Sequence, residues 1–369
     1  MAASASKLFQ PVRVGNMALA HRIVMPPLSR FRADDQHVMK PMAVEYYKQR
    51  SSAPGTLIVG EGTLTAPQAS GYKNSPGIWT AAQIAAWKKI VDVVHAKQCF
   101  IFLQLFDMGA SADPAVLEAD GGHPYVGAGD IPFSGRTEPP RPMTVDEIHE
   151  HTEYFATAAR NAVNGAGCDG VEIHAANGYL LDQFLQTNTN NRTDEYGGSI
   201  ENRLRFPLAV VDAVVRSVSA KKTGVRISPW SRFQGMRMPD PVPTFSEFVK
   251  CLRDAHPDLA YLHLVTPRVD EDGQSTREAD ADERDDFIRK IWGDRRIISA
   301  GGFTRESGMK AADTTEDLIA YGRAFIANPD LVLRLRETAL INKGDRSKYY
   351  SSGPDGYIDY PFLSPSPHV

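Results

Sequence analysis

Three residues with the functional groups of a catalytic site stand close together in the segment GCDGVEIHAANGYLLDQF, residues 167–184. His174 and Asn177 are three residues apart, and Tyr179 follows Asn177 by two. Two neutral hydrogen-bond donors aimed at one point suit a carbonyl oxygen that gains negative charge, and each commonly lowers the barrier by roughly 3 kcal/mol. A tyrosine, with a pKa of about 10, is well matched to protonating an enolate carbon. None of these side chains can transfer a hydride, so a cofactor would have to supply it.

The spacing decides whether these side chains can meet. In a continued strand, His174 and Asn177 would point to opposite faces, because strand side chains alternate. The Asn177–Gly178 pair is a strong turn signal, and a turn or helical start brings residues three apart back to one side. The trio can then converge above the end of a strand. Spacing alone leaves a second interpretation open, in which the three residues are ordinary polar groups at a strand end.

Eight short apolar runs recur along the chain, and segments with helical periodicity separate them. In residues 81–97 and 199–218, for example, apolar side chains recur at intervals of three and four. Strands alternating with helices in this number predict an α/β fold, a single (β/α)8 TIM barrel spanning residues 1–369, with an open doubly wound sheet as the alternative. The predicted strands are residues 22–27, 56–62, 99–105, 169–174, 224–229, 260–265, 296–302 and 318–325.

The longest stretch without helical periodicity is residues 106–143, which is rich in glycine and proline. It follows the third predicted strand, at the end of the strands where a barrel of this kind keeps its active site. A loop of this length in a compact domain is usually a functional element. We therefore expect a lid or binding loop over the active site.

Composition argues against several other classes of function. Of the 369 residues, 42% are hydrophobic and 23% are charged, which is typical of a soluble globular enzyme. The formal net charge of -4 favours binding neither to nucleic acid nor to an anionic membrane. Cys99, Cys168 and Cys251 are far apart, which argues against a disulfide scaffold and a thiolate zinc site and fits a reducing compartment. No run approaches about 18 apolar residues and neither end carries a targeting signal, so we expect a cytoplasmic protein.

Two motif-like patterns have simpler explanations. GAGCDG, residues 165–170, has the form of a dinucleotide-binding GxGxxG motif, but it follows the predicted helix 145–163 and precedes a strand. Because the nucleotide fingerprint requires the opposite order, these glycines predict a helix end and a tight turn. His149 and His151 are two apart on the same helix and lack the HExxH spacing of a zinc site, so we expect solvent-facing histidines and no metal ion.

The segment around the trio, EIHAANGYLLDQFLQTNTNNRTDEYGGSIENRLRF, closely resembles the hallmark segment of the Old Yellow Enzyme family. Members of that family are FMN-dependent ene-reductases built on a TIM barrel. The likeness covers nearly the whole chain and includes LFQPVRVGNMALAHRIVMPPLSRFRA, PGTLIVGEGTLTAPQASGY, YGRAFIANPDLVLRL and DGYIDYP. Several specific motifs in the same order make a chance resemblance negligible.

The resemblance implies a role for each member of the trio. His174 and Asn177 would bind the carbonyl or nitro oxygen of an activated alkene, and Tyr179 would donate a proton to the alkene α-carbon. FMN, reduced by NADPH or less often NADH in the same pocket, would give a hydride from N5 to the β-carbon on the opposite face. The expected substrate is a small-molecule activated alkene, which could be an enone, an enal, a nitroalkene or one specialised metabolite, and the expected assembly is a monomer or homodimer.

The resemblance also places flavin contacts at the ends of the first three predicted strands. Pro27, Leu28 and Ser29 correspond to positions near the flavin O4 and N5. Most relatives have threonine or cysteine at position 29. Serine keeps the hydroxyl but loses a methyl group, which leaves the tuning of the flavin potential open. Gly62 is expected beside the ring, and Gln104 is expected to bond to its pyrimidine edge.

Later strands supply the remaining expected flavin contacts. Arg226 should lie near N1 and O2, where its positive charge stabilises the reduced anionic flavin. Gly301 and Gly302 allow close backbone approach to the FMN phosphate, and Gly322 and Arg323 supply an amide and a guanidinium. A surface salt bridge explains an arginine at the carboxyl end of a barrel strand poorly.

The expected substrate pocket departs most from the family. Phe106 stands where several relatives have tryptophan, and a smaller aromatic ring should widen or reshape the pocket. Tyr357, in DGYIDYP, is expected to line the pocket as well. Three other functions remain open: a flavin-dependent isomerase or dehydrogenase, a flavin or phosphate binder without turnover, and a cofactor-free lyase. The presence of Tyr179 favours the reductase, because the proton donor is retained.

Overall fold

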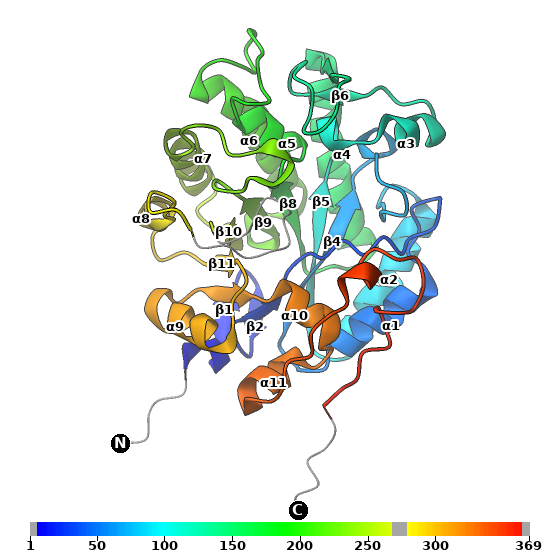
Figure 1. Ribbon diagram of the computed structural model, residues 1–369, viewed down its shortest axis with the longest axis vertical. Helices are drawn as coiled ribbons and strands as arrows, with labels where there is room; N and C mark the ends of the chain where they lie inside the picture. The colour runs from blue at the N-terminus through cyan, green and yellow to red at the C-terminus, as the bar shows by residue number, and fades with distance from the viewer. Residues whose placement is uncertain (1–5, 268–278, 364–369) are drawn as a thin grey trace, which may run out of the picture.

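The barrel predicted from the apolar runs is present in the computed structural model, which describes residues 6–267 and 279–363 (Figure 1). Eight parallel strands close on one another in the order β3, β4, β5, β8, β9, β10, β11, β12. The prediction that neither end carries a targeting signal rests partly on residues 1–5 and 364–369. These residues lie outside the described ones. The barrel strands are β3 (Ile23–Met25), β4 (Leu57–Leu64), β5 (Phe100–Phe106), β8 (Gly170–Ala175), β9 (Thr223–Ile227), β10 (Tyr261–Val265), β11 (Ile297–Ala300) and β12 (Leu318–Ala320).

Helices cover the outside of the barrel (Figure 1). The two helices predicted by periodicity are α2 (Ala81–His95) and α6 (Ile200–Val218). α2 begins with a capping box, in which the Thr80 hydroxyl accepts from the Gln83 N–H and the Gln83 side chain accepts from the Thr80 N–H. No described helix is long and apolar enough to cross a membrane. The other outer helices are α1 (Pro41–Arg50), α4 (Val145–Arg160), α7 (Val242–Ala255), α8 (Asp286–Trp292), α9 (Arg305–Thr315) and α11 (Leu331–Glu337).

A two-stranded hairpin closes the barrel at the amino ends of its strands. It consists of β1 (Val12–Val14) and β2 (Met17–Leu19), which pair antiparallel. Its buried side chains share one apolar cluster with Leu57 and Leu318, the first residues of β4 and β12. Each aliphatic side chain of this size stabilises the fold by about 1.5–3 kcal/mol when fully buried. The amino end is therefore filled with apolar side chains, and the carboxyl end is left for a site.

The last predicted strand, residues 318–325, is wrong in its second half. β12 ends at Ala320, and the helix α10 (Gly322–Ala327) begins two residues later. The apolar residues Phe325 and Ile326 are buried from this helix and not from a strand. An apolar run of this length does not distinguish a buried strand from a buried helix.

The insertion 106–143 is less irregular than its composition predicts. It contains a short helix, which starts where the Asp113 carboxylate accepts from the Ala115 N–H. It also contains two very short strands that pair with each other. A periodicity search misses such elements because they are too short to show a period. They are α3 (Pro114–Ala119), β6 (Val126–Gly127) and β7 (Arg141–Pro142).

The dinucleotide-like motif at 165–170 is a helix end and a turn, as predicted. α4 continues into a π-helical turn, Asn161–Gly165, and Gly167 then adopts a left-handed φ of +85°. β8 begins at Gly170. These glycines reverse the chain between a helix and a strand.

The two histidines of α4 differ from each other. His149 is exposed, as expected, but the expectation is wrong for His151, which is only 4% exposed. His151 shares the inward stripe of α4 with Ile148 and Phe155, at helical intervals of three and four. Its Nδ1 atom is hydrogen-bonded to the buried carboxylate of Asp107, which satisfies the polar ring inside the core.

Candidate active site

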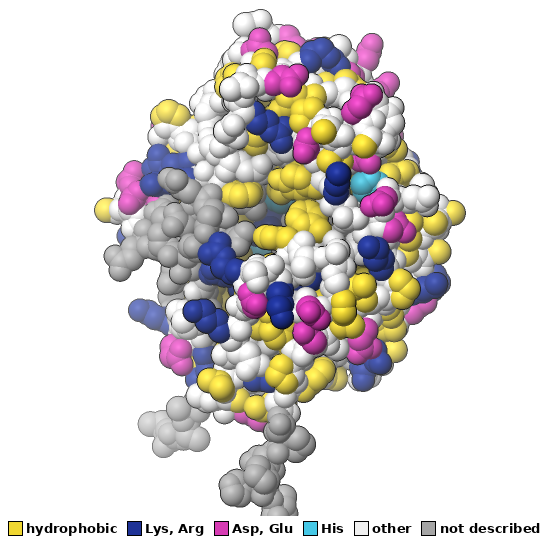
Figure 2. Space-filling view, turned by 45° about the vertical axis from the view of Figure 1, so that its right-hand side comes forward, with side chains coloured by type: hydrophobic (Ala, Val, Ile, Leu, Met, Phe, Trp, Pro, Cys, Tyr) yellow, Lys and Arg dark blue, Asp and Glu magenta, His cyan; other side chains and the backbone are white. Residues whose placement is uncertain are grey.

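A cavity of about 730 Å³ opens at the carboxyl ends of the barrel strands. Figure 2 shows a hollow near the centre of one face, with hydrophobic side chains around it. The volume lies in the range of cofactor and substrate sites. All predicted site residues except Tyr357 line this cavity. On the expected substrate side these are Phe106, His174, Asn177 and Tyr179; on the expected cofactor side they are Pro27, Leu28, Ser29, Gly62, Gln104, Arg226, Gly301, Gly302, Gly322 and Arg323.

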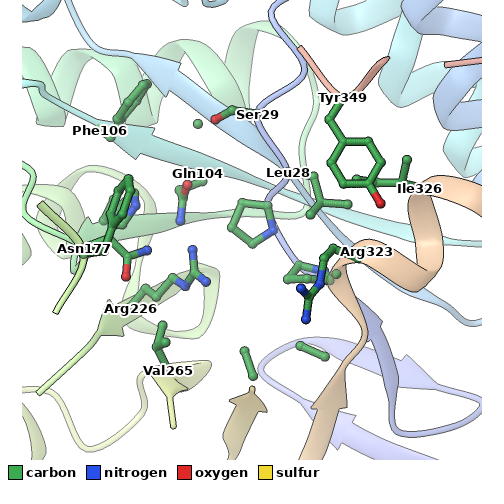
Figure 3. Close-up of a pocket in the computed structure, with 18 of the residues that line it drawn as sticks. Leu28, Ser29, Gln104, Phe106, Asn177, Arg226, Val265, Arg323, Ile326 and Tyr349 are labelled. Carbon is green, nitrogen blue, oxygen red and sulfur yellow. The ribbon is translucent and has the colours of Figure 1, made fainter. Parts of the chain in front are cut away.

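Two arginines face the cavity from different parts of the barrel. Figure 3 shows Arg226 on one side of the cavity, beside Gln104, and Arg323 on the other. Near Arg323 two glycines leave the backbone without side chains. Gly302 has a left-handed φ of +66°, and a Cβ on Gly322 would lie 3.4 Å from Leu28 Cδ2. This arrangement suits a ligand with a polar ring toward Arg226 and an anionic group toward Arg323.

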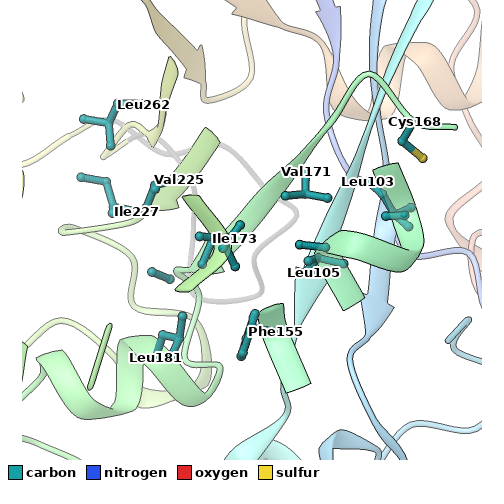
Figure 4. Packing of buried hydrophobic residues seen from close by; sticks show 14 of the residues in the cluster. Leu103, Leu105, Phe155, Cys168, Val171, Ile173, Leu181, Val225, Ile227 and Leu262 are labelled. Atoms are coloured by element: carbon teal, nitrogen blue, oxygen red, sulfur yellow. The ribbon is translucent and has the colours of Figure 1, made fainter. Parts of the chain in front are cut away.

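β8 carries His174 to the cavity and fixes its direction. Val171 and Ile173 point into the core outside the barrel, where Figure 4 shows them near Leu105 and Phe155. Because side chains alternate along a strand, His174 points the other way, toward the inside of the barrel. The packing of the outer core therefore positions a side chain of the site.

The chain leaves the extended conformation directly after β8, as the Asn177–Gly178 signal predicts. These two residues adopt left-handed φ angles of +57° and +77°, and α5 (Leu180–Leu185) begins directly after Tyr179. The ring centroids of His174 and Tyr179 lie 4.8 Å apart. The Phe106 ring packs edge-on against Tyr179 at 5.1 Å. The turn thus brings the trio to one cavity.

Burial sets the protonation states of His174 and Tyr179. Burial, reinforced by Arg226 and His263, holds the pKa of His174 well below its ordinary value, so the imidazole is neutral. Burial, and to a smaller extent the neighbouring Tyr72, raises the pKa of Tyr179 well above its ordinary value, so the hydroxyl keeps its proton. The Nδ1 atom of His174 is buried without a hydrogen-bond partner among the described residues. Such an atom is costly to leave unpaired and often marks a ligand contact.

A buried polar network lies inside the barrel beside the cavity. Glu172 accepts from Gln104 Nε2 at 2.8 Å and is hydrogen-bonded to His263 Nδ1 at 2.8 Å. Burial raises the pKa of Glu172, but His263 and Arg226 together bring it below its ordinary value. Glu172 is therefore a carboxylate, and its hydrogen bond with Gln104 uses the amide nitrogen of that side chain.

Gln104 and Arg226 form the cavity wall beside this network. Because its nitrogen is bonded to Glu172, Gln104 offers its carbonyl oxygen, which lies near the bare position of Gly62. The Nε atom of Arg226 is buried without a hydrogen-bond partner in the described part of the chain. Glu172 and His263 were not predicted from the sequence. The available signal was a polar residue inside an apolar strand run.

Aromatic side chains that were not predicted complete the substrate side of the cavity. Phe31 contacts Tyr72 at 5.6 Å and Tyr350 at 5.4 Å between ring centroids, and all three line the cavity. Phe233 lines the cavity as well. Phe31 and Phe233 each follow a predicted strand by four residues, so an aromatic residue after a strand was the available signal. Tyr350 lies far from any predicted strand, and nothing in its local sequence marks it.

Tyr357, which was predicted to line the cavity, does not reach it and is fully buried. Its ring stacks on Tyr46 at 4.1 Å and lies 4.7 Å from the guanidinium of Arg32. Arg30 and Arg32 both donate to the Tyr349 carbonyl, at 3.0 and 2.8 Å. Tyr357 is thus part of a clamp on the C-terminal segment, and Tyr349 and its neighbour line the cavity in its place.

The insertion 106–143 does not form the expected lid. Phe106 is its only residue among those described as lining the cavity. Tyr125 packs with Met108 and Leu117 in the apolar cluster that contains Phe106. Farther along, Phe133 packs with Ala110 and Met236, and the described residues of the insertion other than Phe106 are absent from the cavity lining.

Known proteins resemble this chain over nearly its whole length. Residues 7–341 match the NADH:flavin oxidoreductase / NADH oxidase family. The Chanoclavine-I aldehyde reductase of Penicillium roqueforti is 46% identical over 363 residues, which cover 97% of this chain and 96% of that protein. The NADP-dependent oxidoreductase lnbE of Aspergillus flavus is 44% identical over 368 residues, which cover 97% and 96%. The crystal structure of Old Yellow Enzyme from a Pichia species has a TM-score of 0.89 and 35% identity, covering 99% of this chain and 96% of that one.

The side chains of the cavity fit FMN, the cofactor of this family. The Gln104 carbonyl offers an acceptor, and the guanidinium of Arg226 offers donors and a positive charge, to the polar edge of a flavin ring. Arg323 and the bare backbone at Gly302 and Gly322 offer room and charge for a phosphate. The chain belongs to the NADH:flavin oxidoreductase / NADH oxidase family and is an FMN-dependent NAD(P)H oxidoreductase of the Old Yellow Enzyme type.

Proposed function

We propose that this enzyme reduces the carbon–carbon double bond of α,β-unsaturated carbonyl and nitro compounds, with NADPH or NADH as the reductant. The observation that carries the proposal is a buried, neutral His174 that faces the cavity together with Asn177 and a protonated Tyr179. FMN, when bound, supplies the hydride that reaches the alkene β-carbon. The chain's own residues bind the substrate, orient it and deliver the proton.

His174 and Asn177 bind the carbonyl or nitro oxygen of the substrate. As the reaction proceeds, negative charge grows on this oxygen, and both hydrogen bonds strengthen. The neutral imidazole can donate without giving up its proton, because burial keeps its pKa low and favours the neutral form. Donors of this kind each lower the barrier by roughly 3 kcal/mol.

Tyr179 holds the proton for the alkene α-carbon. Its raised pKa keeps the hydroxyl protonated at neutral pH, so the donor carries its proton when the substrate binds, and it regains a proton from water after each turnover. An enolate carbon is basic enough to take that proton, and a positioned general acid contributes roughly 10²–10⁴-fold to the rate. Contacts with the rings of His174 and Phe106 fix where the phenol lies.

Residues at the carboxyl ends of the strands would hold FMN. Gln104 would accept from a ring N–H, and the positive charge of Arg226 would favour negative charge on the ring. Arg323 would bind the phosphate. Ser29 would offer a hydroxyl to the ring. The remaining contacts come from backbone that approaches closely, at Pro27, Leu28, Gly62, Gly301, Gly302 and Gly322.

The preferred substrate is an unsaturated aldehyde with a sizeable apolar group. The aldehyde-reductase activity named for the Penicillium roqueforti relative favours an aldehyde. The rim formed by Phe31, Tyr72 and Tyr350 favours a flat apolar body, because aromatic side chains contribute large contact areas with preferred edge-to-face geometry.

Anaerobic mixing of the purified, FMN-loaded protein tests the proposal. NADPH should bleach the flavin absorbance, and an aromatic enal such as α-methylcinnamaldehyde should restore it with formation of the saturated aldehyde. An allylic alcohol as the product would show that the carbonyl is reduced instead. A flavin that NADPH bleaches but no enal, enone or nitroalkene reoxidises would contradict the proposed function.

A further inference from the structure

Four side chains hold the backbone of the turn that carries Asn177 and Tyr179. Asn177 has a left-handed φ, which asparagine adopts more readily than most other residues, and the side chains around the turn hold its backbone in this conformation. Each peptide group of Asn177 and Gly178 is bonded. Ser228 Oγ accepts from the Asn177 N–H at 2.7 Å, Gln234 Nε2 donates to the Asn177 carbonyl at 2.8 Å, Asp182 Oδ2 accepts from the Gly178 N–H at 2.9 Å, and Gln183 Nε2 donates to the Gly178 carbonyl at 2.7 Å.

Asp182 is the ionisable member of this set. It is fully buried, and two donors face its carboxylate: the Gly178 N–H and, at 2.8 Å, Gln186 Nε2. Burial raises its pKa to about 7, with the bonds from Gln186 and Gly178 acting in the opposite direction. Among the described residues, no cation pairs with it. A buried carboxylate without a cation is costly, so its position calls for a reason other than stability.

Gln186 has only one useful orientation. It is also fully buried, and its Oε1 accepts from the Met238 N–H at 2.9 Å. Its amide nitrogen must therefore face Asp182. Rotating the amide would place the nitrogen against the Met238 N–H, leaving two donors opposed.

We propose that Asp182 is a positioning residue for the active-site turn, with Gln186 as its orienting partner. Residue 182 faces two fixed donors, so it must provide two acceptors, which a carboxylate does and an amide does not. Gly178 lies between Asn177 and Tyr179, so loss of its bond loosens both side chains. The importance of this loosening for turnover rests on the proposed function, but the conformation of the turn does not.

The Asp182→Asn variant of the FMN-loaded enzyme is the first arm of the test. An asparagine leaves one of the two donors opposed to its own amide, so the turn should loosen. We expect affinity for 4-chlorophenol, read from the flavin absorbance, to fall by about tenfold, the usual cost of one unmade buried hydrogen bond. Hydrogen exchange of the peptide covering residues 175–182 should quicken by a similar factor.

The Asp317→Asn variant is a matched control. Asp317 is 3% exposed and accepts from Ser299 and Arg289, but it precedes β12 at the opposite end of the barrel. This variant should lower thermal stability without changing phenol affinity or exchange in residues 175–182. Equal changes in both variants would overturn the proposal, because the effect would then be general destabilisation.

A second substitution should restore the turn. In Asp182→Asn, Gln186→Glu, the new carboxylate can accept from both the Met238 N–H and the asparagine amide, and the asparagine oxygen can accept from the Gly178 N–H. Phenol affinity and exchange should return to within about twofold of the wild type. This rescue also supports the proposal if the single variant fails to fold and the double variant folds.

Two outcomes overturn the proposal. One is an Asp182→Asn enzyme with wild-type phenol affinity and exchange, and the other is a double variant no better than the single one. Failure of the proposed function looks different. There, Tyr179→Phe would reduce alkenes at the wild-type rate while the Asp182 results stand.

Discussion

The two walls of the cavity are built in different ways. The wall that fits FMN comes from the ends of strands, through residues such as Gln104, Arg226 and Gly302, whose positions follow from the closed barrel. The other wall comes from segments outside the strands, through residues such as Phe31, after β3, and Tyr350, beyond β12. The comparison teaches that the fold itself supplies the cofactor site, whereas substrate choice depends on side chains that hold irregular segments in place.

The irregular wall has its own supports. Arg30 and Arg32, both buried, donate to the backbone carbonyl of Tyr349 and so hold the C-terminal segment beside the cavity. Tyr350 still has 49% of its surface exposed. The catalytic turn stands between the walls, because β8 positions His174 whereas Asn177 and Tyr179 follow after the strand. Substitutions on each side should therefore separate into distinct phenotypes.

The largest separation is expected from Tyr179→Phe on the turn. Removing the hydroxyl removes the proton donor, so reoxidation of the reduced enzyme by an enal should slow by about 100-fold or more. Bleaching by NADPH should stay within about twofold of the wild type, because that step needs no proton from Tyr179. Stopped-flow absorbance measures both steps, and equal loss of both would contradict a proton-donor role.

A substitution in the strand-end wall should affect the cofactor alone. Arg323→Ala removes a charged hydrogen-bond donor from the proposed phosphate contact, so the dissociation constant of FMN should rise by about 10–100-fold. With FMN in excess, KM for the enal should not change. Fluorescence titration of the apoprotein with FMN measures the first quantity. A larger change in KM than in FMN affinity would place Arg323 on the wrong wall.

The irregular wall should show the reverse pattern with a smaller effect. Tyr350→Ala removes an exposed ring that contacts Phe31 at 5.4 Å, so KM for an aromatic enal should rise by about three- to tenfold, in line with one lost aromatic contact. FMN affinity and KM for a small aliphatic enal should be unchanged. Steady-state kinetics with both enals decides, and equal effects on the two substrates would count against a substrate-side role.

The smallest expected effect is a dependence on pH through Asp182. Its pKa of about 7 lies above the ordinary 3.8, so protonation of Asp182 stabilises the fold fully below about pH 4, and this stabilisation is lost as the pH rises through 7. The hydrogen bonds of the turn favour the ionised form of Asp182 instead. Protonation of its carboxylate would place a hydrogen opposite one of the two donors, the Gly178 N–H or Gln186 Nε2. Enal reduction should therefore fall about twofold from pH 8 to pH 7, where half of Asp182 is protonated. Asp182→Asn should lack this step, and a step of the same size in that variant would assign it to another group.

The same contrast explains how much could be predicted from the sequence. Strand ends were predictable because apolar runs mark the strands, and the family motifs mark the polar residues that follow them. The resemblance, and not spacing, separated catalysis from strand-end capping for His174 and Asn177. Tyr357 was misplaced because its ring packs on Tyr46 and Arg32 through long-range contacts that no local pattern encodes. Tyr350 was missed for the same reason. His151 was missed although it shares the local helical periodicity of Ile148 and Phe155, because a polar ring was assigned to solvent.

Isotope labelling tests the central claim most directly. α-Methylcinnamaldehyde that carries deuterium on its β-carbon is reduced in D₂O with unlabelled NADPH, and the positions and relative configuration of deuterium in the early product are read by NMR and mass spectrometry. The account predicts a saturated aldehyde with solvent deuterium on the α-carbon, from the exchanged hydroxyl of Tyr179, and ordinary hydrogen from NADPH beside the original deuterium on the β-carbon, added to opposite faces. A second deuterium on the β-carbon, addition to one face, or an allylic alcohol as the product would contradict it.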